Sequence, residues 1–432
     1  MSQATLALII FLVTYALIVA ERPHRTLAAL LGAGAMILTG ILHQDEAVHS
    51  VDFNTIGLLA GMMILVNALH KTGAFEWLAV VIVRKTKGHP GTILLSFFAL
   101  TAVASAFLDN VTTVLLVCPL TFLIADRLEV DPMPLILSEI MASNIGGTAT
   151  LIGDPPNIMI GSAVGLDFMA FVKHLAPIAI IIGLVIGVSM RAAYGRALKP
   201  SAAMREVAAS LSPPPLKTDR RSLYICLAVL GAVVIGFLLH GALGLEAATI
   251  ALGGATVLLV LSRHDLHESL AEIEWPTLFF FIGLFVVVGG VEKVGLLDRF
   301  GRWLLDACGG NLALTAMGLL WGCALISAIV DNIPATAALI PVVKAMAESV
   351  HPGMHQPWAQ PDIMPLWWAL AMGACLGGNA TIVGASANVV VAGLAERAGR
   401  PIIFARFLRV GVPVTLVSLL LSSAYLFLRY LR

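Results

Sequence analysis

The chain contains 432 residues, of which 59% are hydrophobic and only 12% are charged, and its formal net charge at pH 7 is zero. This composition excludes a soluble globular domain, and the balanced charge argues against binding to nucleic acid. Apolar runs close to the ~20 residues that a helix needs to cross a bilayer recur along the whole length. The sequence therefore predicts an all-α polytopic membrane protein whose first partner is the lipid bilayer.

Apolar runs in the first half predict six membrane-spanning helices and one helical hairpin. The predicted spans cover residues 4–20, 26–42, 55–70, 92–108, 134–152 and 174–191, and the hairpin covers 109–126. The first run resembles a secretory signal sequence, but no small-residue cleavage site follows it, so we interpret it as a retained helix. Segment 74–86 carries charges on one side only and is predicted to lie in the membrane interface.

A basic segment at 192–221 separates the two halves, and its three consecutive prolines exclude a helix at that point. The excess of Lys and Arg predicts that this linker is cytoplasmic. The same rule places the loop that holds Arg22 and Arg25 in the cytoplasm and the N-terminus in the periplasm. We therefore expect a multi-pass protein of the inner (plasma) membrane.

The second half, 222–432, repeats the organisation of the first half, 1–191. Its predicted spans cover 222–240, 245–262, 276–291, 311–330, 364–383 and 405–429, with a hairpin at 331–347 and an interfacial segment at 296–308. A shift of 222 residues places Asp109 on Asp331, and a shift of 231 places Gly147 on Gly378. Because the second half enters from the cytoplasm, we predict two inverted structural repeats, a plan found in many secondary transporters.

The first duplicated motif is the pair Asp109-Asn110, which recurs as Asp331-Asn332. A carboxylate in an unbroken helix at the bilayer centre costs roughly 2.5–3.5 kcal/mol on insertion scales. Asp and Asn favour turns and helix N-caps, where their side chains accept hydrogen bonds from free backbone N–H groups. We therefore predict a re-entrant helical hairpin in each half, with its tip at mid-depth.

The second duplicated motif runs from Gly146 to Asn157 and recurs from Gly377 to Asn388. Gly-Gly permits unwound backbone, and Pro155-Pro156 cannot continue a helix. Broken helices are tolerated in membranes where their free backbone groups line a cavity or bind a ligand. The motif therefore predicts an unwound transmembrane helix in each half that contributes to a binding site.

Asp154 breaks the symmetry of the second motif, because Ala385 occupies the matching place. No Lys or Arg is evident near Asp109, Asp154 and Asp331, so we expect a positive species, most simply a proton, to visit the three carboxyls. Burial in a medium of low dielectric favours the neutral form of a carboxyl, which suits a proton carrier.

Other chemistry finds no support in the sequence. The five cysteines lack metal-ligand spacing, and no Walker, metalloprotease or haem-attachment motif occurs. We expect no cofactor, no metal and no catalytic residues, and hence a secondary transporter and not an enzyme. An intramembrane hydrolase that uses Asp109 and Asp331 as an acid–base pair is the alternative from another class.

The Gly-Asp-Pro-Pro-Asn segment at 153–157, preceded by Asp109-Asn110, resembles the ion transporter superfamily. Within it, the chain is similar to the ArsB/NhaD group, which includes arsenite permeases, sodium–proton antiporters and the melanosomal P protein. The resemblance implies an elevator-type fold with a site where hairpin tips meet unwound helices. The implied substrate-binding residues are Asn110, Thr112, Thr113, Gly147, Thr148, Thr150, Asn157, Asn332, Gly378, Asn379, Thr381 and Asn388, and the implied coupling residues are Asp109, Asp154 and Asp331.

The leading functional hypothesis is export of arsenite or antimonite in exchange for protons. Arsenite at neutral pH is the uncharged triol As(OH)₃, and Thr and Asn side chains are suitable partners for its hydroxyls. The alternatives are a sodium–proton antiporter and a carrier of small anions or dicarboxylates. The resemblance brings in a soluble ATPase subunit, which some arsenite permeases use, as a candidate partner. The sequence leaves open whether the chain acts as a monomer or as a homodimer.

Overall fold

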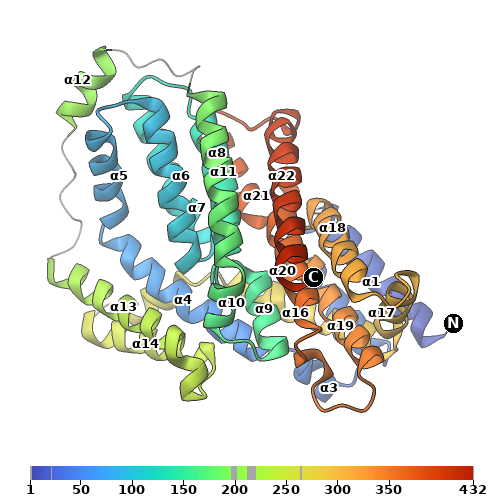
Figure 1. The fold of residues 1–432 in the computed structure, drawn as a ribbon. Coiled ribbons are helices and arrows are strands. Elements are labelled where there is room, and N and C mark those ends of the chain that lie inside the picture. Colours follow the sequence, from blue (N-terminus) through green and yellow to red (C-terminus); the bar gives the residue numbers. More distant parts are fainter. Residues whose placement is uncertain (1, 21, 196–201, 212–219, 263–264, 432) are drawn as a thin grey trace.

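The computed structural model describes residues 2–20, 22–195, 202–211, 220–262 and 265–431, and in these residues all regular structure is helical (Figure 1). The helices of the first half are α1 (Gln3–Ala20), α2 (Arg25–Leu38), α3 (Gln44–His49), α4 (Phe53–Lys71), α5 (Ala74–Lys85), α6 (Pro90–Phe107), α7 (Asn110–Arg127), α8 (Met133–Gly147), α9 (Pro155–Val164), α10 (Phe168–His174) and α11 (Ala176–Tyr194).

The helices of the second half are α13 (Arg220–Leu243), α14 (Ala247–Ser262), α15 (Leu266–Ala271), α16 (Trp275–Lys293), α17 (Leu296–Ala307), α18 (Leu312–Val330), α19 (Asn332–Val350), α20 (Met364–Gly377), α21 (Ser386–Arg397) and α22 (Phe404–Tyr430), with the 3₁₀ helices η1 (Pro357–Ala359) and η2 (Ile382–Gly384). Of the predicted linker 192–221, residues 196–201 and 212–219, including the three prolines, lie outside the described residues. Between these two gaps runs α12 (Ala202–Ser210).

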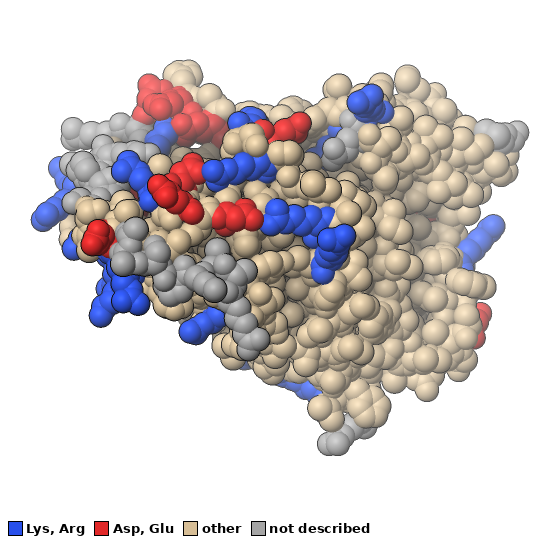
Figure 2. All heavy atoms as spheres, turned by 90° about the horizontal axis from the view of Figure 1, so that it is seen from above, with Lys and Arg blue, Asp and Glu red and all other residues tan. Residues whose placement is uncertain are grey.

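Ten of the described helices are long and apolar enough to cross a membrane, and an eleventh span results if α9 and α10, which bend by 117° relative to each other, count as one. The predicted all-α polytopic class is thereby confirmed. Figure 1 shows α12 at one end of the molecule, above α5, which it contacts, and α3 at the opposite end. Figure 2 looks down onto the α12 end, where many acidic and basic side chains gather next to one another, whereas the remaining surface in this view carries only scattered charges.

The helix bounds follow the shift seen in the sequence. The bounds of α4 and α16, and those of α5 and α17, differ by 222 residues at both ends. The starts of α8 and α20, and those of α9 and α21, differ by 231 residues. The same amino-acid pattern has therefore produced the same run of helices twice.

The second helix of each half packs against a helix of the other half. Helix α2 packs on α16 of the second half, and α14 packs on α4 of the first half. Both crossings need a glycine, since a Cβ on Gly61 or Gly283 would lie 2.7 Å from a backbone carbon, that of Ala251 or Ala29. Neither half can bury its own α4 or α16 alone, so the halves form one interlocked structure.

The predicted hairpin bounds are wrong, although the turn residues are right. Residues 110–127 form one helix, α7, and residues 332–350 form another, α19, so each hairpin consists of α6 with α7 or of α18 with α19. Pro119 and Pro341 lie inside these helices and do not end them. Helices that are buried among other helices tolerate the loss of the one backbone hydrogen bond that a proline cannot make.

Replacing Gly146 by alanine is expected to lower the free energy of unfolding by about 3 kcal/mol, as overpacking of a tight helix contact does. A Cβ there would overlap the backbone of Ala102 on α6, and Gly377 meets Ala324 on α18 in the same way, at 2.6 Å. Thermal unfolding in detergent measures the effect. Gly183→Ala is the matched control, because its Cβ would meet only a side-chain methyl of Ile145 at 3.8 Å. Equal melting temperatures for the two variants would contradict the prediction.

Candidate functional site

One amide side chain, that of Asn157, bonds to the unwound backbone between the two parts of the first broken helix. Helix α8 ends at Gly147 and α9 begins at Pro155, and the side chain of Asn157 reaches back into the gap. Its Nδ2 donates to the carbonyl oxygens of Gly147, Thr148 and Thr150 at 3.3, 3.2 and 2.8 Å. The unwound carbonyls therefore have a partner although the helix has stopped, as a polar break inside a membrane requires.

The second break repeats this arrangement. Asn388 Nδ2 donates to the carbonyls of Gly378 and Thr381 at 2.7 and 2.8 Å. Each break is also tied to its own hairpin, since the Thr381 hydroxyl donates to the carbonyl of Ala328 at 2.6 Å, and the Thr150 hydroxyl donates to that of Ala106. The duplicated motif thus specifies a duplicated structure of the backbone.

The hairpin tips carry the predicted Asp caps. Asp109 Oδ1 accepts from the backbone N–H of Thr112 at 2.8 Å, and the Thr112 hydroxyl donates to the other carboxylate oxygen. Asp331 Oδ1 accepts from the N–H of Ile333 at 3.1 Å. Asp331 also has a φ of +87°, a backbone conformation that costs a non-glycine residue about 1–3 kcal/mol and needs support from its surroundings.

Asn144, a residue that the sequence did not single out, joins the two halves. It is fully buried on α8, and its Nδ2 donates to Asn379 Oδ1 at 2.9 Å and to Asn388 Oδ1 at 3.0 Å. Its Oδ1 accepts from Asn110 Nδ2 at 3.1 Å. The predicted residues Asn110, Asn379 and Asn388 therefore meet around one central amide, and we call these four residues the asparagine cluster.

The contact between Asn144 and Asn388 has a counterpart at the matching positions of the two halves. The position that matches Asn144 is Cys375 on α20, whose Sγ lies 3.6 Å from Asn157 Oδ1. The helix before each break thus contacts the asparagine that follows the break in the other half. Asp154, fully buried, accepts from Asn332 Nδ2 at 3.0 and 3.2 Å and so joins the first break to the second hairpin.

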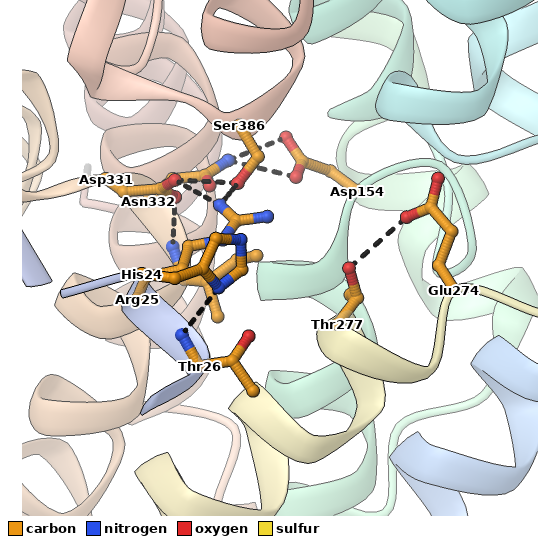
Figure 3. A network of polar contacts seen from close by, with 10 residues as sticks. His24, Arg25, Thr26, Asp154, Glu274, Thr277, Asp331, Asn332 and Ser386 are labelled. Carbon is orange, nitrogen blue, oxygen red and sulfur yellow. Dashed lines mark hydrogen bonds and ion pairs between the residues drawn. The ribbon is translucent and has the colours of Figure 1, made fainter. Parts of the chain in front are cut away.

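A cation stands among the carboxyls, and this corrects the expectation that no Lys or Arg is near them. Arg25, the first residue of α2, donates through Nη1 to Ser386 Oγ at 2.6 Å and lies 3.5 Å from Asp331 Oδ2 (Figure 3). Ser386 Oγ in turn donates to Asp331 Oδ2 at 2.7 Å. The guanidinium also stacks on the ring of Phe280, 5.2 Å from its centroid. Asp331 is therefore partly neutralised by the protein itself.

Glu274 approaches the same region from the start of α16, where it accepts from the hydroxyl of Thr277 at 3.2 Å (Figure 3). Asp109 is joined to neither Asp154 nor Asp331 by a hydrogen bond or an ion pair in the described residues. In the same part of the chain, no group of three or more His, Cys, Asp or Glu residues could hold a metal ion.

Three buried polar atoms of the predicted residues have no hydrogen-bond partner in the described part of the chain: Asn110 Oδ1, Thr113 Oγ1 and Asn379 Nδ2. Asn110 and Asn379 both bond to Asn144, and Thr113 follows Asn110 by about one helical turn. One free acceptor, one free donor and one hydroxyl, which can do both, therefore lie close together. Thr148, by contrast, uses its hydroxyl on the carbonyl of Asn144 at 2.8 Å.

A pocket of about 310 Å³ lies between α9, α16 and α19, close to the contact between Asp154 and Asn332. Its lining includes Met159 and Ala337, which follow Asp154 and Asn332 by five residues each. Along a helix, five residues correspond to roughly 7.5 Å. The pocket therefore begins about that far from the contact between Asp154 and Asn332.

Two relatives cover nearly the whole chain. The "46 kDa membrane protein" of Mycobacterium leprae is 40% identical over 433 residues, which cover 99% of each protein. An "uncharacterized transporter" of Mycobacterium tuberculosis is 40% identical over 432 residues with the same coverage. The human P protein is 34% identical over 98% of this chain, which spans 60% of that longer protein.

A solved structure shares the fold. The YdaH transporter of Alcanivorax borkumensis aligns with a TM-score of 0.57 at 16% identity and covers 88% of this chain and 86% of its own. The family described as "Citrate transporter" (CitMHS) matches residues 15–373. The resemblance to the ion transporter superfamily and to the P protein is thereby confirmed. The chain belongs to the CitMHS family, and it is a multi-pass membrane transporter and not an enzyme.

Proposed function

We propose that this transporter exports arsenite or antimonite, as neutral trihydroxy species, in exchange for protons. The observation that carries the proposal is the set of unpartnered atoms around Asn144. A bare metal cation cannot use the Asn379 N–H donor, and a fully ionised anion cannot use the Asn110 acceptor. A neutral triol uses a donor, an acceptor and a hydroxyl together, so it satisfies all three atoms.

The balance of charge supports the same class of substrate. The acids Asp154, Asp331 and Glu274 lie near one another in Figure 3, and Arg25 contacts one of them, Asp331. This excess of acid repels a carboxylate substrate and attracts protons. Arg25 already compensates Asp331, so we assign proton carriage to Asp154, whose contacts with Asn332 are retained whether or not the carboxyl is ionised.

We further propose that the halves 1–191 and 222–432 are inverted repeats that work as an elevator. The repeated helix bounds, the reciprocal packing of α2 and α14, and the reciprocal contacts of Asn144 and Cys375 support this arrangement. Helices α2, α4, α14 and α16 would form the fixed frame, and the hairpins with the broken helices would form the moving part. In this proposal the linker is cytoplasmic, the N-terminus is periplasmic and the chain resides in the plasma membrane. A soluble ATPase subunit and a homodimer stay predictions.

Asp154→Asn is expected to reduce arsenite-driven proton flux at least tenfold, because the variant cannot exchange a proton. The amide keeps an oxygen for Asn332 Nδ2, so the fold should persist. Purified protein in liposomes with an internal pH dye measures this flux against arsenite, antimonite and Na⁺ gradients. Asp265→Asn, an exposed helix cap on α15, is the control. Unchanged coupling in Asp154→Asn would remove Asp154 from the mechanism.

A small anion is the second candidate substrate, because Arg25 supplies a cation and the family description names citrate. The same liposome assay separates the candidates. Proton flux driven by citrate but not by arsenite would favour the anion, and flux driven by Na⁺ alone would favour a sodium–proton antiporter.

A further inference from the structure

Glu139 is a buried acid, like Asp154, but the proposed substrate site does not use it. It lies on α8 with no exposed surface, and it is bonded only to two side chains of α7 in the described residues. Thr121 Oγ1 donates to Glu139 Oε1 at 2.5 Å, and Cys118 Sγ lies 3.4 Å from Glu139 Oε2. Both partners are themselves buried. A carboxyl in this position demands an explanation, because burying an unpaired charge is costly.

Among the residues that the structure describes, no charged side chain bonds to Glu139. Helices α6, α7, α11, α20, α21 and α22 pack on α8, and α6 and α20 contain no charged residue. The charges of the other four lie near their ends, at Asp126, Arg127, Arg191, Glu396, Arg397, Arg406, Arg409 and Arg429. The titratable group within hydrogen-bonding distance is the Cys118 thiol.

The fold itself does not require a polar group here. The positions of the second half that match Cys118, Thr121 and Glu139 are Ile340, Val343 and Leu370, and all three are buried. At the matching positions of the equivalent helix pair, α19 with α20, the side chains are therefore all apolar. The polar trio of the first half costs stability that an apolar trio would not, so a structural role alone does not account for it.

The partners of Glu139 suit a group that gains and loses a proton. A hydroxyl and a thiol can each donate to a carboxylate, and each can accept from the O–H of the neutral acid. A sodium ion would need several more oxygen ligands than these two side chains provide. The ligand chemistry of the trio therefore matches a proton and not a metal ion.

The position of Glu139 places it between the surface and the asparagine cluster. A surface pocket of about 720 Å³ at the loop between α7 and α8 is lined by Met133, six residues before Glu139. Asn144 follows five residues after Glu139 on the same helix. With a rise of 1.5 Å per residue, these intervals correspond to roughly 9 and 7.5 Å. The pocket rim carries two ion pairs, Arg400 with Asp126 and Arg406 with Asp131, at 2.8 and 2.9 Å.

We propose that Glu139, with Thr121 and Cys118, forms a second proton-binding site that loads from this pocket and acts alongside Asp154. The inference rests on the proposed proton coupling, but its ligand is the proton itself, whatever the substrate. Binding of one proton from the pocket converts the Glu139 carboxylate to the neutral acid within the hydrogen-bonded trio. Release of that proton later in the transport cycle restores the carboxylate.

The test begins with Glu139→Gln, which has the shape of the neutral acid. Arsenite-driven proton flux in liposomes should fall at least tenfold, whereas arsenite-for-arsenite exchange at equal pH should continue, since exchange needs no net proton movement. The triple variant Cys118→Ile/Thr121→Val/Glu139→Leu copies the second half and should fold and behave likewise. Ser138→Ala, which removes a neighbouring buried hydroxyl of α8, is the control with unchanged flux. Normal coupling in the triple variant would overturn the proposal.

An infrared titration separates this inference from the substrate proposal. The carbonyl stretch of protonated carboxyls should change with pH in the wild-type protein. The part of this signal that Glu139 contributes should be absent from Glu139→Gln, while the part that Asp154 contributes remains. If no arsenite, Na⁺ or citrate drives flux but the Glu139 signal titrates, the proposed function fails and the proton site stands. If Glu139→Gln leaves the titrating signal unchanged, the proton site is refuted even where arsenite is transported.

Discussion

Asn144→Ala is expected to lower the free energy of unfolding by about 2 kcal/mol and to reduce transport by about 100-fold. Three hydrogen bonds are lost, two of them between the halves, and interhelical hydrogen bonds contribute ~0.6 kcal/mol each on average in membrane proteins. The larger effect on transport follows because the amides of Asn110, Asn379 and Asn388 lose their common partner, and displacements near 1 Å can cost about 100-fold in rate. Thermal unfolding and liposome transport measure the two effects.

Two variants make this prediction specific. Asn144→Cys copies Cys375 and keeps one weak donor toward Asn388, so it should fall between wild type and Asn144→Ala in both measurements. Ser143→Ala removes a hydroxyl that donates only to the carbonyl of Ile140, and it should behave as wild type. Wild-type transport by Asn144→Ala would show that the asparagine cluster is not needed for function.

The parts of the site that the sequence predicted depend on local chemistry. The run from Gly146 to Pro156 begins with two consecutive glycines and ends with two consecutive prolines, which together favour a break in the helix. Asn157 finds its carbonyl partners within ten residues of itself. Asp109 caps the helix that begins at the next residue. Such contacts are set by the neighbouring chain, so the duplicated motif was enough to locate them.

The parts that the sequence did not predict depend on contacts between distant segments. Arg25 and Asp331 lie 306 residues apart, and no local pattern indicates that the start of α2 meets the second hairpin. Asn144 and Glu139 were overlooked because the comparison of halves selects what recurs, and their counterparts are Cys375 and Leu370. The available signal for both was a strongly polar residue, next to a serine, inside an otherwise apolar run.

The residues that differ between the halves include charged side chains whose counterparts in the other half are apolar. Two symmetric halves present equivalent surfaces to the two sides of the membrane, which serves alternating access but gives no direction to charge movement. Asp154, Glu139 and Arg25 stand opposite Ala385, Leu370 and Ala247 at the matching positions. In the proposed function, the repeated residues build the framework of the site, and these unrepeated residues add two acids and a cation that would give the proton movement its direction.

Arg25→Gln is the second prediction with a large effect. The variant leaves Asp331 with Ser386 and its backbone donor but without the guanidinium, at a position where the carboxylate is 12% exposed. Removing one partner of a buried ion pair typically costs about 3–5 kcal/mol, and the residual exposure of both side chains reduces this to about 2 kcal/mol here. Transport should fall at least 30-fold, because an uncompensated Asp331 would bind a proton in place of the one that Asp154 exchanges.

The double variant Arg25→Gln/Asp331→Asn decides whether the pair acts through its charge. With the carboxylate also removed, no uncompensated charge remains and no carboxyl at 331 competes for the proton, so both the melting temperature and transport should return toward those of the wild type. Arg22→Gln is the matched control, since Arg22 is exposed in the same loop and its loss should change neither quantity. Additive losses of stability in the double variant would mean that Arg25 supports the fold through its packing on Phe280 and not through Asp331.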